Sequence, residues 1–257
     1  MQTRRQVLDL GLWIASCAAL ASVGCATCPA PSPSLSTPQP QPQPPEGPPP
    51  GLLDPDLTVL RTPPGPLTIV QRVPGQAGIL RRRARMITDS DLEHLTTFER
   101  RMRETLESTD GGVGLAGPQV GVGARAILVM IDARGEKPHV DFFLNPRIVE
   151  RSDDITADYE GCLSIPGLCG LVKRNRRVVV EHGLIGRRER VEAQDFDARI
   201  FQHEIDHLDG VLYVDRVDGE IHPRERLKEL REKLREQQPK VACTPMLGGR
   251  YRDEVLL

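Results

Sequence analysis

Residues 195 to 210 read DFDARIFQHEIDHLDG, and this stretch predicts the central helix of the folded domain. Helical spacing places Phe196 and Ile200 on the same face as His203 and His207. Because that face is apolar, we expect both histidines to point into the protein. The sequence Asp209-Gly210 provides a stop signal, so the helix is predicted to run from Asp195 to about Leu208.

The helix contains an H-E-x-x-H pattern made by His203, Glu204 and His207. Two histidines four residues apart can reach one metal ion from one face of a helix. Glu204 lies beside them, where its carboxylate can take a proton from a metal-bound water. A charged, solvated helix can carry this pattern by accident, but buried imidazoles without partners would be costly. The pattern therefore predicts a metallohydrolase centre.

A catalytic metal site of this kind usually has three protein ligands, so one more is needed. Asp209, Asp215 and Asp218 follow the helix and are available. Upstream, Cys162 stands between glycine and leucine in the segment EGCLS, at 160–164. The ordinary role of a free cysteine is that of a small buried apolar residue. Spacing alone does not choose between the aspartates and the cysteine.

Around this helix the sequence predicts further short elements. A helix begins near Ser90, which forms a capping-box pattern with Glu93, and Gly111-Gly112 ends it. A last helix begins near Pro223. Strands clustered between helices, without regular β-α-β alternation, predict an α+β domain. The strand candidates are 67–70, 126–131, 142–144 and 178–180.

The amino-acid composition differs between the amino-terminal part and the rest of the 257 residues. The net charge of −2 gives no sign of a nucleic-acid partner. Many of the 23 prolines fall between residues 29 and 50, a segment that cannot bury a core. We therefore predict a leader, a proline-rich disordered linker, a catalytic domain and a C-terminal tail. Their predicted ranges are 1–28, 29–65, 66–240 and 241–257.

The amino terminus is typical of an export signal. Arg4 and Arg5 precede an apolar run from Val7 to Val23, in the manner of a twin-arginine leader. Cys25 or Cys17 could be the lipid-modified residue of a lipoprotein. This pattern predicts a periplasmic or cell-envelope protein, with a lipid anchor as its only membrane contact. The alternative is a non-functional leader or an incorrectly assigned start, which would leave the protein in the cytoplasm.

Three segments together resemble the signature motifs of the peptide deformylase family. They are GVGLAGPQ at 112–119, EGCLS at 160–164 and QHEIDHLDG at 202–210, in the order found in that family. The similarity extends over about residues 67 to 236. It implies small antiparallel sheets around a central helix that carries HExxH, followed by a C-terminal helix.

The resemblance implies a ligand set and a catalytic residue. Cys162, His203 and His207 would hold one divalent metal ion. The family typically uses Fe²⁺, with Ni²⁺, Co²⁺ or Zn²⁺ as alternatives. Glu204 would be the general base and then the general acid.

The resemblance also implies how substrate is bound. Gln119 and the backbone N–H of Leu163 would stabilise the oxyanion, and Val113, Gly114 and Gly161 would line or hydrogen-bond the peptide. The implied reaction removes the formyl group from N-formylmethionyl peptides or nascent chains, giving formate and a free amino terminus.

Two other hypotheses fit parts of the pattern. An HExxH metallopeptidase tethered to the envelope would use the same helix. A degenerate module could keep the fold and capture formylated peptides without cleaving them. Nucleotide binding is not expected, because the glycine-rich segment at 112–117 lacks the lysine of a phosphate-binding loop.

Overall fold

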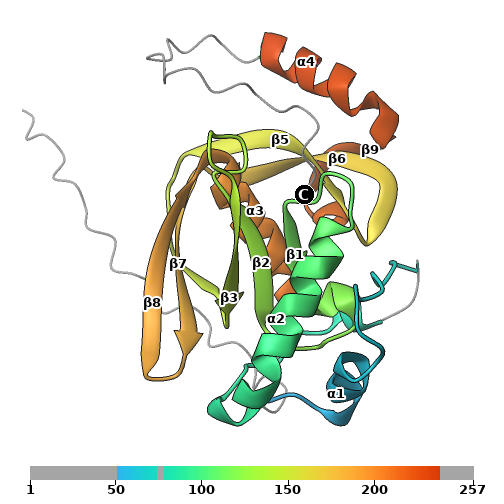
Figure 1. Cartoon of the computed structure of the whole chain (residues 1–257). Helices are drawn as coiled ribbons and strands as arrows, with labels where there is room; N and C mark the ends of the chain where they lie inside the picture. Colours follow the sequence, from blue (N-terminus) through green and yellow to red (C-terminus); the bar gives the residue numbers. More distant parts are fainter. Residues whose placement is uncertain (1–50, 74–77, 238–257) are drawn as a thin grey trace, which may run out of the picture. The chain divides into compact units, whose positions relative to one another are not determined.

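The computed structural model describes residues 51–73 and 78–237, which belong to one compact unit. In this part of the chain three antiparallel sheets of three strands surround helix α3 (Figure 1). The strand orders are β1-β2-β3, β4-β7-β8 and β5-β6-β9. The α-helices are α1 (Asp54–Leu60), α2 (Leu92–Glu107), α3 (Asp195–Leu208) and α4 (Leu227–Gln237). The strands are β1 (Gly114–Ala116), β2 (Ala126–Ile131), β3 (His139–Leu144), β4 (Arg147–Arg151), β5 (Ile155–Cys162), β6 (Ile165–Asn175), β7 (Arg177–Leu184), β8 (Arg187–Gln194) and β9 (Val217–Pro223).

Helix α3 is the central element, as the sequence predicts. It begins at Asp195 and ends at Leu208. Its apolar residues pack with residues of β2 and β7, in the largest core cluster of the described residues. Phe201 meets Phe143 of β3 edge to face, with the ring centroids 4.9 Å apart. The helix is therefore held rigidly by two sheets, and this rigidity fixes the side chains that it directs inward.

Strand β2 is apolar at every position because both of its faces are covered. Successive side chains of a strand point to opposite faces. Ile127 and Val129 pack with α3, whereas Ala126 and Leu128 pack with α2. Figure 1 shows α2 in front of β1 and β2, with α3 behind them. The two helices are thus joined through a single buried sheet.

Strands β5 and β6 form the long hairpin that carries the EGCLS segment. Their antiparallel register is regular from Ile155 to Glu160 and then shifts between Glu160 and Cys162. Such a bulge redirects the side chains that follow it. It lies where the hairpin turns, next to α3. Strand β9 extends the same sheet by pairing with β6, and Leu168 faces Pro223.

The predicted boundary of the linker at residue 65 is wrong, because residues 51–65 are folded. Helix α1 packs against α2 through Leu60, which is buried. Asp56 is buried as well, and it accepts the N–H of Gly123 at 2.7 Å and pairs with Arg85. The partners of Leu60 and Asp56 belong to the folded domain, so this segment is part of that domain.

The prediction of a strand at 67–70 is also wrong, because among the described residues this segment joins none of the three sheets. It has no regular secondary structure, and this part of the chain hydrogen-bonds to two different segments of the domain. The N–H of Val70 donates to the carbonyl of Gln119 at 2.7 Å, and the N–H of Arg72 donates to the carbonyl of Ser164 at 2.8 Å. The segment therefore ties two of the three motifs together.

The α+β class and the small antiparallel sheets around a central helix are confirmed, and α4 is the expected C-terminal helix. The predicted leader at 1–28, the linker as far as residue 50 and the tail from 241 lie outside the described residues. Of the helices described between residues 51 and 237, none is both long enough and apolar enough to cross a membrane.

Candidate metal centre

Helix α3 brings the two predicted histidines to one place. His203 and His207 lie one turn apart on the buried face, with exposed fractions of 2% and 1%. Their ring centroids are 5.0 Å apart. The alternative of a solvated helix with accidental histidines is therefore excluded by burial.

The third member of the cluster is Cys162, at the end of β5. Its Sγ lies 3.3 Å from Nε2 of His207. One donor atom from each of Cys162, His203 and His207 lies within 4.8 Å of the others. The aspartates that the sequence left open are engaged elsewhere: Asp209 pairs with Arg125, Asp215 with Arg81 and Asp218 with Lys173. Tertiary structure thus places the cysteine, and not these aspartates, beside the two histidines.

The protonation of this cluster suits a divalent cation. Nδ1 of His203 lies 3.0 Å from the Glu160 carboxylate, which leaves Nε2 as the lone-pair nitrogen, and that atom has no hydrogen-bond partner among the described residues. Burial, with smaller effects from His203 and Arg174, lowers the pKa of His207 well below its usual value, so this imidazole is neutral. Burial also raises the pKa of the Cys162 thiol to about 12. A bound cation would reverse that shift and hold the thiolate.

Glu204 lies beside the cluster in an unusual state. It is fully buried, and neither carboxyl oxygen has a hydrogen-bond partner in the described part of the chain. Burial raises the pKa of Glu204 well above its usual value, and the negative charge of Glu160 raises it further. Gly114 of β1 faces the carboxyl group so closely that a Cβ there would collide with it. This environment favours the protonated form of the carboxyl group, which suits a group that takes up and returns a proton.

Gln119 reaches the centre from the short turn after β1. Its side chain is buried, and its Oε1 accepts the backbone N–H of Ala116 at 2.8 Å. This hydrogen bond orients the amide so that Nε2 points to Sγ of Cys162, 3.5 Å away. The amide N–H groups of Gln119 are therefore available to a polar atom at the centre.

The predicted substrate-binding residues fall in two places. Gly161 and Leu163 flank Cys162 and line a crevice of about 80 Å³ beside it. Gly114 lies against Glu204, as described above. Val113, by contrast, has its side chain in the main core, and its carbonyl accepts the N–H of Met130 at 2.8 Å. The Val113 side chain thus belongs to the core and not to the wall of the crevice.

Sequence reasoning did not assign a role to Glu160, Arg174 or Arg199, the charged groups that support the cluster. Glu160 is fully buried and receives hydrogen bonds from Arg174 at 2.9 and 3.0 Å and from Arg199 at 2.7 Å. Arg174 also pairs with Asp206, which in turn pairs with Arg216. The available signal was Arg199, a charged residue four positions before His203 on the inward face of the helix.

This network holds Glu160 in its ionised form. Burial by itself would raise the pKa of Glu160, but the charges of Arg174 and Arg199 and the hydrogen bond with His203 hold it well below its usual value. A carboxylate that faces Nδ1 of a histidine fixes the tautomer and the orientation of the ring. The network therefore prepares His203 to bind a cation through Nε2.

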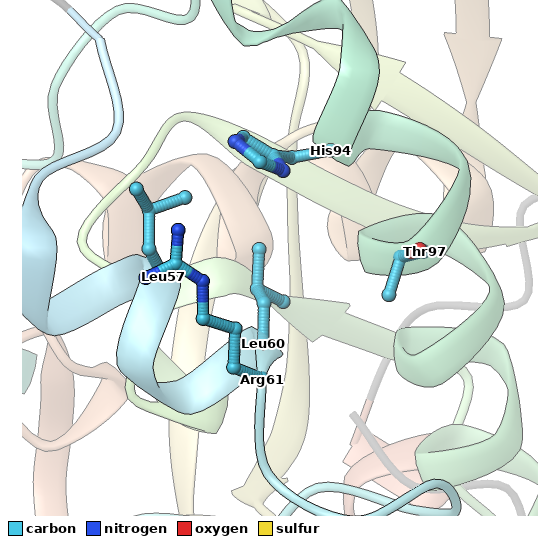
Figure 2. Close-up of a pocket in the computed structure, with 5 residues that line it drawn as sticks. All are labelled: Leu57, Leu60, Arg61, His94 and Thr97. Atoms are coloured by element: carbon cyan, nitrogen blue, oxygen red, sulfur yellow. The ribbon is translucent and has the colours of Figure 1, made fainter.

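A larger crevice of about 160 Å³ lies away from this cluster, between α1 and α2 (Figure 2). Leu57, Leu60 and Arg61 line it from the α1 side, and His94 and Thr97 line it from α2. None of the described residues that line it carries a carboxylate or a thiol. The volume of a crevice therefore does not show where the candidate metal site lies, because Cys162 lines the smaller of the two crevices.

Comparison with known proteins agrees with this geometry. The family described as polypeptide deformylase matches residues 68–222. Peptide deformylase 2 of Gloeobacter violaceus is 42% identical over 144 residues, which cover 56% of this chain and 76% of that protein. A peptide deformylase of Picosynechococcus sp. is 38% identical over 152 residues, which cover 59% and 80%.

Solved structures agree as well. The actinonin-bound class I type b peptide deformylase from Acinetobacter baumannii has a TM-score of 0.52 and 32% identity, and the match covers 60% of this chain and 100% of that one. A peptide deformylase from Synechococcus elongatus in complex with actinonin has a TM-score of 0.53 and 36% identity, with 66% and 89% covered. Since the family match takes in more than half of the residues, the chain belongs to the peptide deformylase family.

Proposed function

We propose that Cys162, His203 and His207 hold one divalent metal ion at which the chain removes the formyl group of N-formylmethionyl peptides. As a peptide deformylase, the chain is a metal-dependent hydrolase that acts on formylated peptides. The observation that carries the proposal is the position of the three donor atoms, within 4.8 Å of one another and beside the unpartnered Glu204 carboxyl. The peptidase and capture hypotheses are not retained.

The donor set suits a first-row transition metal, and we propose Fe²⁺. One thiolate and two imidazoles are ligands that iron, cobalt, nickel and zinc all accept. When bound, the ion would polarise the formyl carbonyl and lower the pKa of a water molecule toward neutrality. Metal analysis of protein purified without oxygen would distinguish Fe²⁺ from the other three.

Glu204 is proposed to move the proton. In the reaction a water oxygen adds to the formyl carbon, and the bond between that carbon and the peptide nitrogen then breaks. Glu204 takes a proton from the attacking water and delivers it to the departing amine, so that formate and a free amino terminus result. Its raised pKa supports this role, because a carboxyl group of ordinary acidity would return the proton poorly.

Two donors are proposed to stabilise the negative charge on the formyl oxygen. One is the side-chain amide of Gln119, held in orientation by Ala116. The other is the backbone N–H of Leu163, the residue that follows Cys162. Donors that are fixed before the reaction do not have to reorganise as charge develops, which is the source of their effect. Gly161 and the backbone at Val113 and Gly114 would contact the extended peptide.

Export remains a proposal that rests on residues 1–28 alone. A protein exported by the twin-arginine route would fold and acquire its metal before it left the cytoplasm, which would protect a ferrous thiolate site. Its substrates would then be formylated peptides outside the cytoplasm. Fractionation of cells tests this: the intact leader on cytoplasmic protein would refute export.

Formate release tests the function directly. The full chain and Glu204→Gln would be assayed with formyl-Met-Ala-Ser, alongside metal analysis of both proteins. We expect Glu204→Gln to keep its metal and to lose activity by about 10²- to 10⁴-fold, the range for a general acid or base. Formate release that survives the substitution would refute the role of Glu204. Metal-loaded wild type without any formate release would refute the function.

A further inference from the structure

The crevice beside Cys162 extends away from the two histidines, His203 and His207. Gly161, Cys162 and Leu163 form one end of it, and the β5–β6 hairpin as far as Leu168 forms a wall. The lining residues contributed by this hairpin are apolar, glycine or cysteine. The remaining lining residue is Arg224, which carries the one charged side chain among the described residues that line the crevice. An apolar groove with a single cation is a surface that selects its ligand by charge.

Arg224 is held at the crevice by the third strand of the sheet. Strand β9 pairs with β6, with Leu168 opposite Pro223, and the turn η5 (Arg224–Arg226) follows directly. This pairing places the start of η5 beside the tip of the hairpin. Arg224 is half-buried there. Its position is therefore set by backbone pairing and not by a flexible loop.

Among the described residues, no carboxylate pairs with the guanidinium group of Arg224. Within residues 51–73 and 78–237, no hydrogen bond or ion pair involves its side chain. Nearby arginines differ: Arg226 pairs with Glu229 at 3.3 Å, and Arg231 pairs with Asp158 at 3.0 Å. A half-buried arginine without a partner has lost part of its hydration and would gain from an anion.

We infer that Arg224 binds a carboxylate of the formylated peptide, a short distance after the formylmethionine. The inference rests on the proposed function, because the crevice is a continuation of the site at Cys162. Arginine holds carboxylates through two parallel N–H donors, so the contact would favour an acidic side chain or the free C-terminus of a short peptide. Arg224 is thus a residue that determines which formyl-peptides are bound well, and the chemistry at Glu204 does not involve it.

Three peptides separate the sources of the carboxylate. Formyl-Met-Ala-Ser-amide is neutral, formyl-Met-Ala-Asp-amide carries an acidic side chain, and formyl-Met-Ala-Ser with a free C-terminus carries the terminal carboxylate. Formate release would be measured for the full metal-loaded chain, Arg224→Gln and the matched control Arg226→Gln. We expect Arg224→Gln to raise KM about three- to tenfold for one or both carboxylate peptides, with kcat unchanged. KM for the neutral peptide should stay constant, as should every value for Arg226→Gln.

Charge reversal excludes a purely structural effect. Arg224→Glu should lower KM for formyl-Met-Ala-Lys-amide relative to the wild type while it raises KM for the aspartate peptide. Equal changes for neutral and charged peptides, or no change for any of them, would overturn the inference. Failure of the proposed function would look different, because the wild type would then release no formate even from the neutral peptide.

Discussion

Glu160 connects the buried charges of the domain to the metal cluster. It accepts hydrogen bonds from Arg174 and Arg199 and faces Nδ1 of His203. Two arginines beside one carboxylate leave a positive excess, which Asp206 offsets through Arg174. A charge buried without its partner would be strongly destabilising, so the members of this group depend on one another.

Replacement of Glu160 by glutamine should therefore weaken both the site and the fold. Glutamine keeps the shape but removes the charge that orients His203 and neutralises Arg174 and Arg199. We expect metal affinity to fall about 10- to 100-fold. The free energy of unfolding should fall by about 3–5 kcal/mol. Metal titration of the apoprotein and urea unfolding would measure these effects. Glu225→Gln, on an exposed residue, serves as the control, and an unchanged metal affinity in Glu160→Gln would contradict the role given to Glu160.

At Gly114 the space beside Glu204 leaves no room for a side chain. A Cβ at this position would overlap the carboxyl group of Glu204, which is enclosed on its other sides. We expect Gly114→Ala to displace that carboxyl group and to lower kcat about 100-fold while the metal is retained. Gly78→Ala is the matched control, because a Cβ there meets nothing within 4 Å. Full formate release by Gly114→Ala would show that Glu204 can move without loss.

At the scale of elements, the start of α2 differs from the prediction. The sequence suggests a capping box at Ser90 and Glu93, but α2 begins at Leu92 and has no side-chain cap. The capping box lies instead at Thr88 and Asp91, on the single 3-10 turn (Asp89–Asp91) that leads into α2. Asp91 also accepts the N–H of Leu52 at 2.9 Å, from the segment before α1. The local pattern could not reveal this choice, because it depends on a partner 39 residues away.

Asp91 should make stability depend on pH. Burial acts to raise its pKa, but hydrogen bonds from Leu52 and Thr88 outweigh burial, so the pKa of Asp91 lies below its usual value. A carboxyl group with a lowered pKa stabilises the fold fully above its unfolded pKa of about 3.9, and this contribution is lost as pH falls through the folded value. We expect Asp91→Asn to be less stable by about 1–2 kcal/mol at pH 7. The difference should shrink below about pH 4.

Urea unfolding of wild type and Asp91→Asn at several pH values would test this. Taking the difference between the two proteins cancels the titration of groups elsewhere, including the metal cluster. Asp89→Asn is the control, because Asp89 is exposed and pairs with Arg187 at the surface. A difference that stays constant down to pH 3 would contradict the assignment.

At the scale of the molecule, helix α1 is part of the catalytic domain. Arg101 of α2 is buried and donates to backbone carbonyls in and after α1, those of Val59, Leu60, Thr62, Pro63 and Gly65. Asp56 holds the N–H of Gly123, which follows the turn that carries Gln119. The segment 51–65 thus stabilises the turn that carries Gln119, a proposed catalytic residue.

Removal of residues 51–65 should lower the stability of the domain. A chain that begins at residue 66 leaves Arg101 buried without acceptors and removes Asp56 from the Gln119 loop. We expect its free energy of unfolding to fall by about 3 kcal/mol or more, because several charge-assisted hydrogen bonds are lost together. A chain that begins at residue 51 keeps these contacts and serves as the control. Equal stability of the two, by urea unfolding and formate release, would show that α1 is dispensable.

The sequence alone determined what depends on local spacing. The bounds of α3, the shared face of His203 and His207 and the apolar strand β2 follow from helix and strand periodicity. Resemblance to a family added Cys162, which spacing could not select. Only tertiary structure decided that Glu160, held by Arg174 and Arg199, faces His203. It also decided that Gly114 must lack a side chain and that residues 51–65 are folded. These features depend on contacts between residues distant in sequence, and no local pattern records which partner a buried charge will meet.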